Sequence, residues 1–358
     1  MKRVVTYSEL RERRRCPYKA HLNYDRRITP IIKSPGLREG TIFDAGMNAL
    51  YDYVALTGSY STDPMREAMV QQWAEERDRI EARIPMMAEE WEPLQDRVDL
   101  LYEVADAYVA YAAQNDCFER IICTQHEGRV PVINEYGRAS TKYDLRFKLD
   151  GLVVIDGKLW VLENKAWKTI AQDAIRMLPL DEQCGMYLWA LRQQVKRHEV
   201  LEDIADAVKR YGMPVGVYYN IIRKATPRTP ALLKDGKTSK DARCDTTADI
   251  YLSTLIERGQ DPADYAEVLE MLRQKGDTFR YREAVYRNHL ELEEIGQRIY
   301  EGTRYLAGKH RFKFPERSCT WECAYFALCL EWSEDLLAER YTVRERRHAE
   351  YEEIEEAA

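Results

Sequence analysis

The chain has 358 residues, a formal net charge of −7 and an apolar content of 45%. This length allows one large domain or two smaller ones, and the composition is typical of a globular protein with a sizeable core. No apolar run is long enough to span a membrane and the N-terminus lacks the apolar segment of a secretory signal, so we expect a cytoplasmic protein. Bulk charge does not indicate nucleic-acid binding, so any DNA site must be a local basic patch.

The N-terminal third is predicted to be mainly helical. Ser8 is the expected N-cap of a short basic helix, which the Cys-Pro pair at residues 16–17 should end. Apolar residues at helical spacing predict a helix over residues 40–57, with Asp44 in its first turns. Residues 64–115 are expected to form two or three amphipathic helices that act as a cap or scaffold.

The middle of the chain alternates between strand and helix signals. Strands are predicted at residues 120–125, 129–134, 143–148 and 215–223, and a helix at residues 180–195. A basic loop to about residue 243 is followed by a helical, highly charged stretch over residues 248–308. We therefore expect one composite domain over residues 1–335, with helical insertions at 58–117 and 245–310, and a charged tail at 336–358 that is solvated or a frayed helix.

Residues 148–165, KLDGLVVIDGKLWVLENK, predict a β-hairpin with Asp156 and Gly157 in its two-residue turn. In that register the numbers of paired residues sum to 313 in every pair, so Asp150 lies opposite Glu163, and Lys165 shares their face. Both faces are otherwise apolar, which predicts helices on both sides of the sheet. Two carboxylates held this close repel unless a cation lies between them, so the hairpin favours a divalent metal site. The alternative is that Glu163 and Lys165 are merely solvated at a strand end.

Three of the eight cysteines, Cys319, Cys323 and Cys329, fall close together near the C-terminus. Four thiolates are the usual complement of an iron–sulfur cluster or a structural zinc, so a fourth ligand is needed. Cys16 is the best candidate, because a Cys-Pro pair after a basic helix is a poor place for an incidental core cysteine. The alternative is that the three are simply buried on a helix. A disulfide framework is not expected in a cytoplasmic protein.

Asp150 followed by Glu163-Asn164-Lys165 resembles the D…(D/E)-x-K pattern of the PD-(D/E)xK nuclease superfamily. The resemblance implies an α/β fold with a central mixed sheet flanked by helices, and metal-dependent hydrolysis of DNA phosphodiester bonds. Asp150 and Glu163 would hold Mg²⁺ or Mn²⁺, with the Asn164 carbonyl as an extra ligand. Lys165 would orient the attacking water or stabilise developing charge.

Two further motifs are similar to the same superfamily. Gly40 to Asp44 matches a G-x-x-x-H motif in which aspartate replaces the histidine, and the resemblance makes Asp44 a metal ligand. Gln183 and Tyr187 match a Q-x-x-x-Y motif that contacts the DNA backbone near the metal. The alternatives are that Asp44 is a partner of its helix dipole in the first turn, and that Gln183 and Tyr187 are ordinary surface and core residues.

The Tyr-Ser-x-Leu start, the lone Cys16-Pro17 and the cysteine triplet resemble the iron–sulfur RecB-type nucleases. That branch includes the AddB nuclease domain, the CRISPR-adaptation nucleases and phage exonucleases. It implies a 4Fe-4S cluster on Cys16, Cys319, Cys323 and Cys329 that clasps the two chain ends in an iron–sulfur clasp. The triplet here is C-x3-C-x5-C, one residue longer in its first gap than the usual C-x2-C-x5-C, so zinc stays an alternative.

Cations beside tyrosines after the strand at 215–223 fit a groove for single-stranded DNA. The expected DNA-binding residues are Arg223, Lys224, Arg228, Lys234, Lys237 and Lys240. Together with the resemblance, they predict a DNA exonuclease that acts on single strands or DNA ends in recombination, repair or phage replication. We expect it in a bacterium or a phage-infected host cell, working alone or with a helicase or recombinase. The rivals are an endonuclease of the same fold, a non-catalytic DNA-binding iron–sulfur module, and a merely solvated basic loop.

Overall fold

The computed structural model describes residues 2–307 and 311–344. Its helices are α1 (Tyr7–Arg15), α2 (Pro17–Ala20), α3 (Pro35–Thr57), α4 (Thr62–Glu81), α5 (Ala88–Asn115), α6 (Gln172–Arg176), α7 (Glu182–Lys196), α8 (Glu202–Tyr211), α9 (Ala248–Glu257), α10 (Ala266–Lys275), α11 (His289–Ala307), α12 (Cys319–Glu322), α13 (Phe326–Leu330) and α14 (Glu334–Arg340). Short π or 3-10 turns cover His21–Asp25, Leu178–Leu180 and Pro262–Tyr265.

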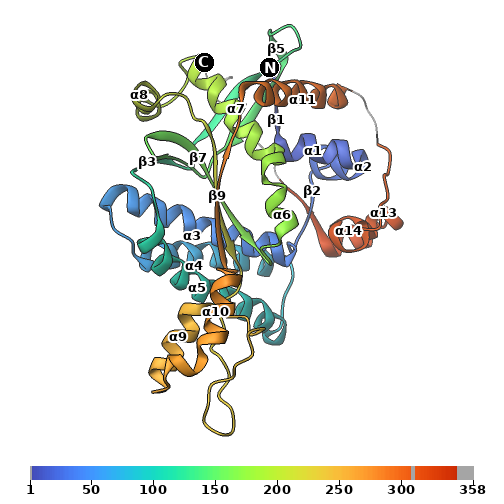
Figure 1. Ribbon diagram of the computed structural model, residues 1–358. Coiled ribbons are helices and arrows are strands. Elements are labelled where there is room, and N and C mark those ends of the chain that lie inside the picture. The colour runs from blue at the N-terminus through green and yellow to red at the C-terminus, as the bar shows by residue number, and fades with distance from the viewer. Residues whose placement is uncertain (1, 308–310, 345–358) are drawn as a thin grey trace.

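A mixed five-stranded sheet forms the centre of the described chain (Figure 1). Its strand order is β3 (Arg120–Thr124), β6 (Gly151–Ile155), β7 (Lys158–Trp167), β8 (Gly216–Arg223) and β9 (Arg280–Tyr286). Only the β7–β8 pair is parallel, and α7 and α8 lie in the crossover between these two strands. A second sheet orders β1 (Arg3–Thr6), β5 (Ala139–Lys148) and β4 (Glu127–Ile133).

The predicted hairpin register is confirmed. Five pairs, from Ile155 with Lys158 to Gly151 with Leu162, follow the expected sum. Asp156 and Gly157 have φ values of 49° and 65°, as a two-residue turn of this kind requires. The ladder ends at Gly151, so Asp150 is not paired with Glu163 as predicted, because the chain bends at Asp150 as it passes from β5 in one sheet to β6 in the other.

Both faces of the β6–β7 hairpin are buried, as the apolar residues on each of its faces predict. Leu152, Val154, Leu159 and Val161 pack on one face against α7, α8 and α11. Val153, Ile155, Trp160 and Leu162 pack on the other against α3, α4 and α5. The hairpin is therefore held in the middle of a helix–sheet–helix sandwich, which fixes the position of the residues at its open end.

Two local predictions were wrong, one in the stretch at 248–308 and one at the N-terminus. The helical stretch at 248–308 contains β9, an edge strand that pairs with β8 over its whole length. Only Val285 of β9 is buried, so the strand lacks the apolar alternation by which strands are recognised. At the N-terminus, Thr6 and not Ser8 caps α1, its side chain accepting a hydrogen bond from the Glu9 amide.

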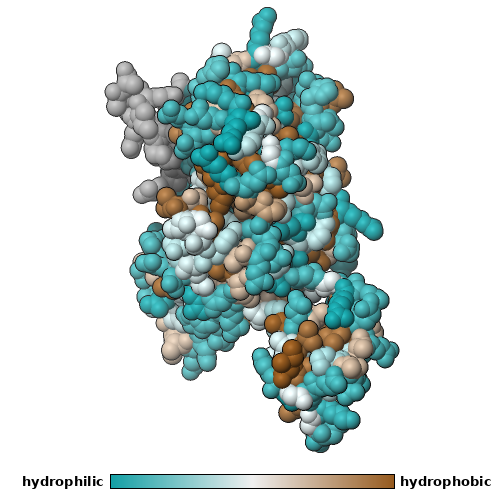
Figure 2. All heavy atoms as spheres, turned by 60° about the vertical axis from the view of Figure 1, so that its left-hand side comes forward, coloured by the Kyte–Doolittle hydropathy of each residue, from teal (hydrophilic) through white to brown (hydrophobic). Residues whose placement is uncertain are grey.

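Residues between β8 and β9 form a small unit with its own core. Tyr251, Leu255, Tyr265 and Leu269 are buried between α9 and α10. In Figure 1 these helices lie at the bottom of the view, and Figure 2 shows the same part projecting from the body. Two carboxylate contacts anchor its root: Arg223 pairs with Asp245, and Lys224 with Glu39 of α3.

The two ends of the described chain meet. Strand β2 (Ile28–Pro30) pairs antiparallel with β10 (Tyr341–Val343), so these three tail residues form a strand and not the predicted frayed helix. The tail beyond residue 344 lies outside the described residues. Leu22, Ile28, Tyr325 and Tyr341 share a small core beneath this pair.

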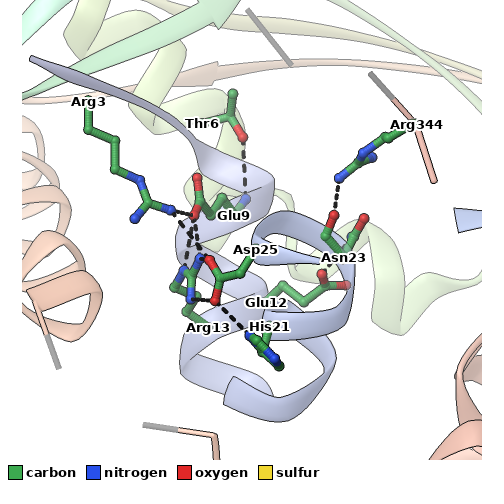
Figure 3. A network of polar contacts seen from close by, with 9 residues as sticks. All are labelled: Arg3, Thr6, Glu9, Glu12, Arg13, His21, Asn23, Asp25 and Arg344. Carbon is green, nitrogen blue, oxygen red and sulfur yellow. Dashed lines mark hydrogen bonds and ion pairs between the residues drawn. The ribbon is translucent and has the colours of Figure 1, made fainter. Parts of the chain in front are cut away.

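A polar network reinforces this junction (Figure 3). The Glu9 carboxylate of α1 accepts hydrogen bonds from Arg13 and Arg3, and the Asp25 carboxylate accepts from Arg13 at 2.6 Å. Arg344 donates to the Asn23 carbonyl, which joins the last described residue to the N-terminal segment. The first and last described segments of the chain are thus joined by strand pairing, apolar packing and hydrogen bonds.

Candidate active site

The open end of the hairpin brings the predicted acidic residues together. The Asn164 amide donates a 2.7 Å hydrogen bond to Oδ2 of Asp150, across the end of the β6–β7 ladder. Glu163 lies on the same side of β7 as Val161, and its side chain is buried. Oε2 of Glu163 is buried and has no hydrogen-bond partner among the described residues. A buried, unsatisfied carboxylate oxygen is costly unless a cation or donor comes to it.

Lys165 lies between two carboxylates. Its Nζ is 2.9 Å from Oε1 of Glu163 and 3.4 Å from Oδ2 of Asp181. Asp181 also caps α7, accepting hydrogen bonds from the Gln183 and Cys184 amides. Sequence reasoning missed Asp181, although an aspartate directly before a helix that carries a Q-x-x-x-Y pattern is a recognisable N-cap signal.

Helix α3 completes one wall of the site. Asp44 lines a cavity of about 340 Å³ together with Asp150, Glu163 and Asn164. Gly40 lines the same cavity, so the predicted motif of α3 does face the hairpin end. Helix α3 begins at Pro35 and not at residue 40, so Asp44 lies beyond the first turns, contrary to the prediction, and is too far from the helix N-terminus to be a partner of its dipole.

The electrostatics of the three acids are those of crowded, desolvated carboxylates. The pKa of Asp150 is raised well above its usual range by burial, and then by the negative charges of Glu163 and Asp44. Burial raises the pKa of Glu163, and Lys165 only partly counteracts it. The pKa of Asp44 is likewise raised by burial. A positive charge in the cavity would favour the ionised form of all three.

Gln183 and Tyr187 lie beside this cluster. The Gln183 amide donates a 2.8 Å hydrogen bond to the Tyr187 hydroxyl, one turn further along α7. Burial and the nearby charges of Glu163 and Asp150 raise the pKa of Tyr187, so its hydroxyl stays a hydrogen-bond donor. Tyr187 also lines a second hollow of about 400 Å³, with Lys148 and the start of α1.

A family comparison covers the part of the chain that carries these residues. A model of the PD-(D/E)XK nuclease superfamily matches residues 4–330. The chain belongs to this superfamily. A comparison with curated proteins finds no match. The nuclease has an α/β core of mixed sheets with helices on both sides, and the match extends to Leu330.

Nucleases of this superfamily use divalent metals such as Mg²⁺. Hard oxygen ligands of the kind that Asp44, Asp150 and Glu163 offer suit such ions. The unpartnered Oε2 of Glu163 fits a cation at this place. As placed, no group of three or more histidine, cysteine or acidic side chains in residues 2–307 and 311–344 could hold a metal ion. The three acids thus line one cavity without forming a finished coordination sphere.

The predicted DNA-binding cations differ in their surroundings. Arg223 and Lys224 are engaged internally, with Asp245 and with the buried Glu39 at 2.8 Å. Lys240 donates to the Asp264 carbonyl and lies over the Tyr265 ring. Arg228, Lys234 and Lys237 have exposed side chains on the projecting unit. The side chains of Arg228, Lys234 and Lys237 are therefore accessible for contacts with phosphate groups. Those of Arg223 and Lys224 form ion pairs within the protein.

The four predicted cluster cysteines are free thiols that are partly exposed. Burial raises the pKa of Cys323 and of Cys329, and the nearby thiols of Cys16 and Cys319 raise it further. Arg15, next to Cys16, pairs with Glu322, next to Cys323, at 2.7 Å. The N-terminal cysteine and the triplet are thus neighbours in space, although they do not form a finished metal site as placed. None of the helices in the described parts of the chain is long and apolar enough to cross a membrane.

Proposed function

We propose that this nuclease is a metal-dependent DNA exonuclease that acts on single-stranded DNA or on DNA ends. The observation that carries the proposal is the convergence of Asp44, Asp150 and Glu163 on one cavity, with Lys165 bonded to Glu163. A divalent ion bound there supplies Lewis-acid activation of the phosphate and of a bound water.

The chain's own residues have distinct roles in this proposal. Asp150, Glu163 and Asp44 hold the ion, and the Asn164 carbonyl is an added oxygen ligand. Lys165, kept charged by Glu163 and Asp181, donates hydrogen bonds to the attacking water or to the developing negative charge on the phosphate. Gln183 orients the Tyr187 hydroxyl, which donates to the DNA backbone.

The preference for ends and single strands rests on the resemblance to the iron–sulfur nuclease branch. The closeness of Cys16 to Cys319, Cys323 and Cys329 supports a cluster, here proposed as 4Fe-4S. Such a cluster would be structural, because the residues around it belong to the junction of the chain ends and not to the acidic cavity.

The test compares linear single-stranded DNA, labelled at either end, with a covalently closed circle of the same sequence, in Mg²⁺ and in Mn²⁺. We expect the linear strand to be shortened from an end while the circle stays intact. Cutting of the circle would make the protein an endonuclease instead. Binding of both substrates without any metal-dependent cutting would make it a non-catalytic module.

A further inference from the structure

A buried polar network lies directly behind the E-x-K motif, on the face of the sheet that packs against α3 and α5. Asn220 of β8 is paired in register with Asn164 of β7 and is 1% exposed. Its amide nitrogen donates to Oδ1 of Asn164 at 2.8 Å and to the Tyr108 hydroxyl at 2.6 Å. The Tyr108 hydroxyl in turn lies 2.5 Å from that of Tyr51.

The network continues to the edge strand β9. The Arg282 guanidinium reaches Oδ1 of Asn220 at 3.4 Å, the Asn115 carbonyl at 2.6 Å and the Asp116 carboxylate. The Tyr60 hydroxyl also donates to Asp116. Two helices and three strands therefore contribute to one chain of hydrogen bonds that ends on the side chain of Asn164.

The network is unusual because the other buried residues on this face of the sheet, which packs against α3 and α5, are apolar. Well-packed apolar side chains would fill the same space without any polar group to satisfy. Burial raises the pKa of Tyr51 and raises that of Tyr108 to about 12, so both hydroxyls keep their protons and can hold fixed hydrogen bonds. A satisfied buried network makes the groups it contains rigid.

Asn164 is the member that touches the acidic cavity. The backbone amide of Asn164 donates a hydrogen bond to Oδ2 of Asp150, and Asn164 lines the cavity together with Glu163. Its side-chain nitrogen has no hydrogen-bond partner in the described part of the chain, and within that part its side-chain oxygen accepts a hydrogen bond from Asn220. Asn164 is therefore anchored through its side chain by Asn220 while its backbone amide holds the Asp150 carboxylate.

We propose that Asn220 is a positioning residue of the nuclease: it fixes Asn164, and through Asn164 it sets the orientation of the Asp150 carboxylate for metal binding. This proposal rests on the proposed metal-dependent function of the acidic cavity. Asn220 itself touches neither the acids nor the DNA, so its effect must appear first in metal affinity. Loss of an outer-shell partner of a metal ligand typically weakens metal affinity by about 10- to 100-fold.

The experiment measures Mn²⁺ binding by calorimetry, together with the Mn²⁺ concentration that gives half-maximal cleavage. Asn220→Leu keeps the branched shape of the side chain but removes its hydrogen bonds with Asn164, Tyr108 and Arg282, and we expect it to weaken Mn²⁺ binding by about tenfold or more. The Asn220→Asp variant should bind Mn²⁺ more tightly than Asn220→Leu. Its carboxylate can accept a hydrogen bond from the Tyr108 hydroxyl and, if the Asn164 side-chain amide rotates, from its NH₂ group, and Arg282 lies beside it. Tyr60→Phe is the matched control: it breaks the far end of the same network, so it should lower the melting temperature and leave Mn²⁺ affinity unchanged.

Wild-type Mn²⁺ affinity in a folded Asn220→Leu variant, or an equal loss in Tyr60→Phe, would overturn the positioning role. Should Asn220→Leu not fold, Asn164→Ala removes the same hydrogen bond from the other side and must show the same loss of affinity. A wild-type protein that binds Mn²⁺ but never cuts DNA would defeat the proposed function and leave the positioning test intact.

Discussion

Replacing Asp150 by asparagine should make the metal-free protein more stable while it removes activity. Asparagine keeps the oxygen that accepts the 2.7 Å hydrogen bond from the Asn164 amide, and it removes a charge that burial and two neighbouring acids oppose. Two carboxylates about 5 Å apart repel by about 3 kcal/mol at an effective dielectric constant of about 20. Lys165 offsets part of this repulsion, so we expect a gain in unfolding free energy of about 1–2 kcal/mol at neutral pH.

The gain should depend on pH with a defined sign. The pKa of Asp150 is higher in the folded protein than its ordinary value of 3.8, so the folded state binds the proton more tightly. The wild type therefore loses stability as the pH rises above about 4 through the folded pKa, and the asparagine variant does not. The difference between the two should be near zero in acid and reach a plateau above the folded pKa of Asp150.

Metal should reverse the order of stability. A ligand present at about 100 times its dissociation constant stabilises the folded state by about 2.7 kcal/mol. Mn²⁺ should thus raise the unfolding free energy of the wild type above that of Asp150→Asn, as measured by chemical denaturation with EDTA or with Mn²⁺. Asp156→Asn, in the exposed hairpin turn, is the matched control and should follow the wild type in both conditions. An Asp150→Asn protein that is less stable than wild type in EDTA at neutral pH would refute the reasoning.

Three further predictions test other parts of the chain. Lys165→Met should lower the cleavage rate by at least about 100-fold, whereas Lys158→Met, on the same strand near the turn, should leave it unchanged; equal rates in the two variants would exclude the proposed role of the ammonium. Glu39→Gln should lower the unfolding free energy by about 3 kcal/mol, since it removes the carboxylate that pairs with the Lys224 ammonium, whose side chain is only 9% exposed. Although burial raises the pKa of Glu39, its hydrogen-bonded cations bring it below 4.5, so this contribution should be present at neutral pH and be lost as the pH falls below that value; a denaturation series with an unchanged wild-type-to-variant difference down to pH 3 would contradict it. Protein purified without oxygen should be brown, with absorbance near 400 nm and about four iron atoms per chain, and Cys16→Ser should lose both while Cys117→Ser keeps them; a colourless, folded protein with zinc would overturn the iron–sulfur proposal.

The hairpin could be predicted from sequence because its determinants are local. Asp156-Gly157 fixes the turn, the turn fixes the register, and the register brings the end of β6 beside Glu163. The bend at Asp150 could not be foreseen in the same way. It arises because β5 and β6 belong to different sheets, which is a property of the whole fold.

The remaining parts of the site depend on contacts between residues far apart in the chain. Nothing near Asn220 indicates that its amide meets Asn164, Tyr108 and Arg282, because the parallel β7–β8 pairing and the edge position of β9 bring them together. Lys224 was expected to contact DNA because it is basic and follows a tyrosine-rich strand. Its contact with Glu39 depends on where α3 packs, and no local signal predicts this.

The acids at the open end of the hairpin are the proposed site of DNA cleavage. The most direct measurement is the single-turnover cleavage of end-labelled linear DNA by wild type, Asp150→Asn and Asp156→Asn in Mg²⁺ and in Mn²⁺, at matched concentrations of folded protein. We predict rapid cleavage by wild type and Asp156→Asn and none above background by Asp150→Asn. Equal cleavage by all three proteins would show that the chemistry takes place elsewhere.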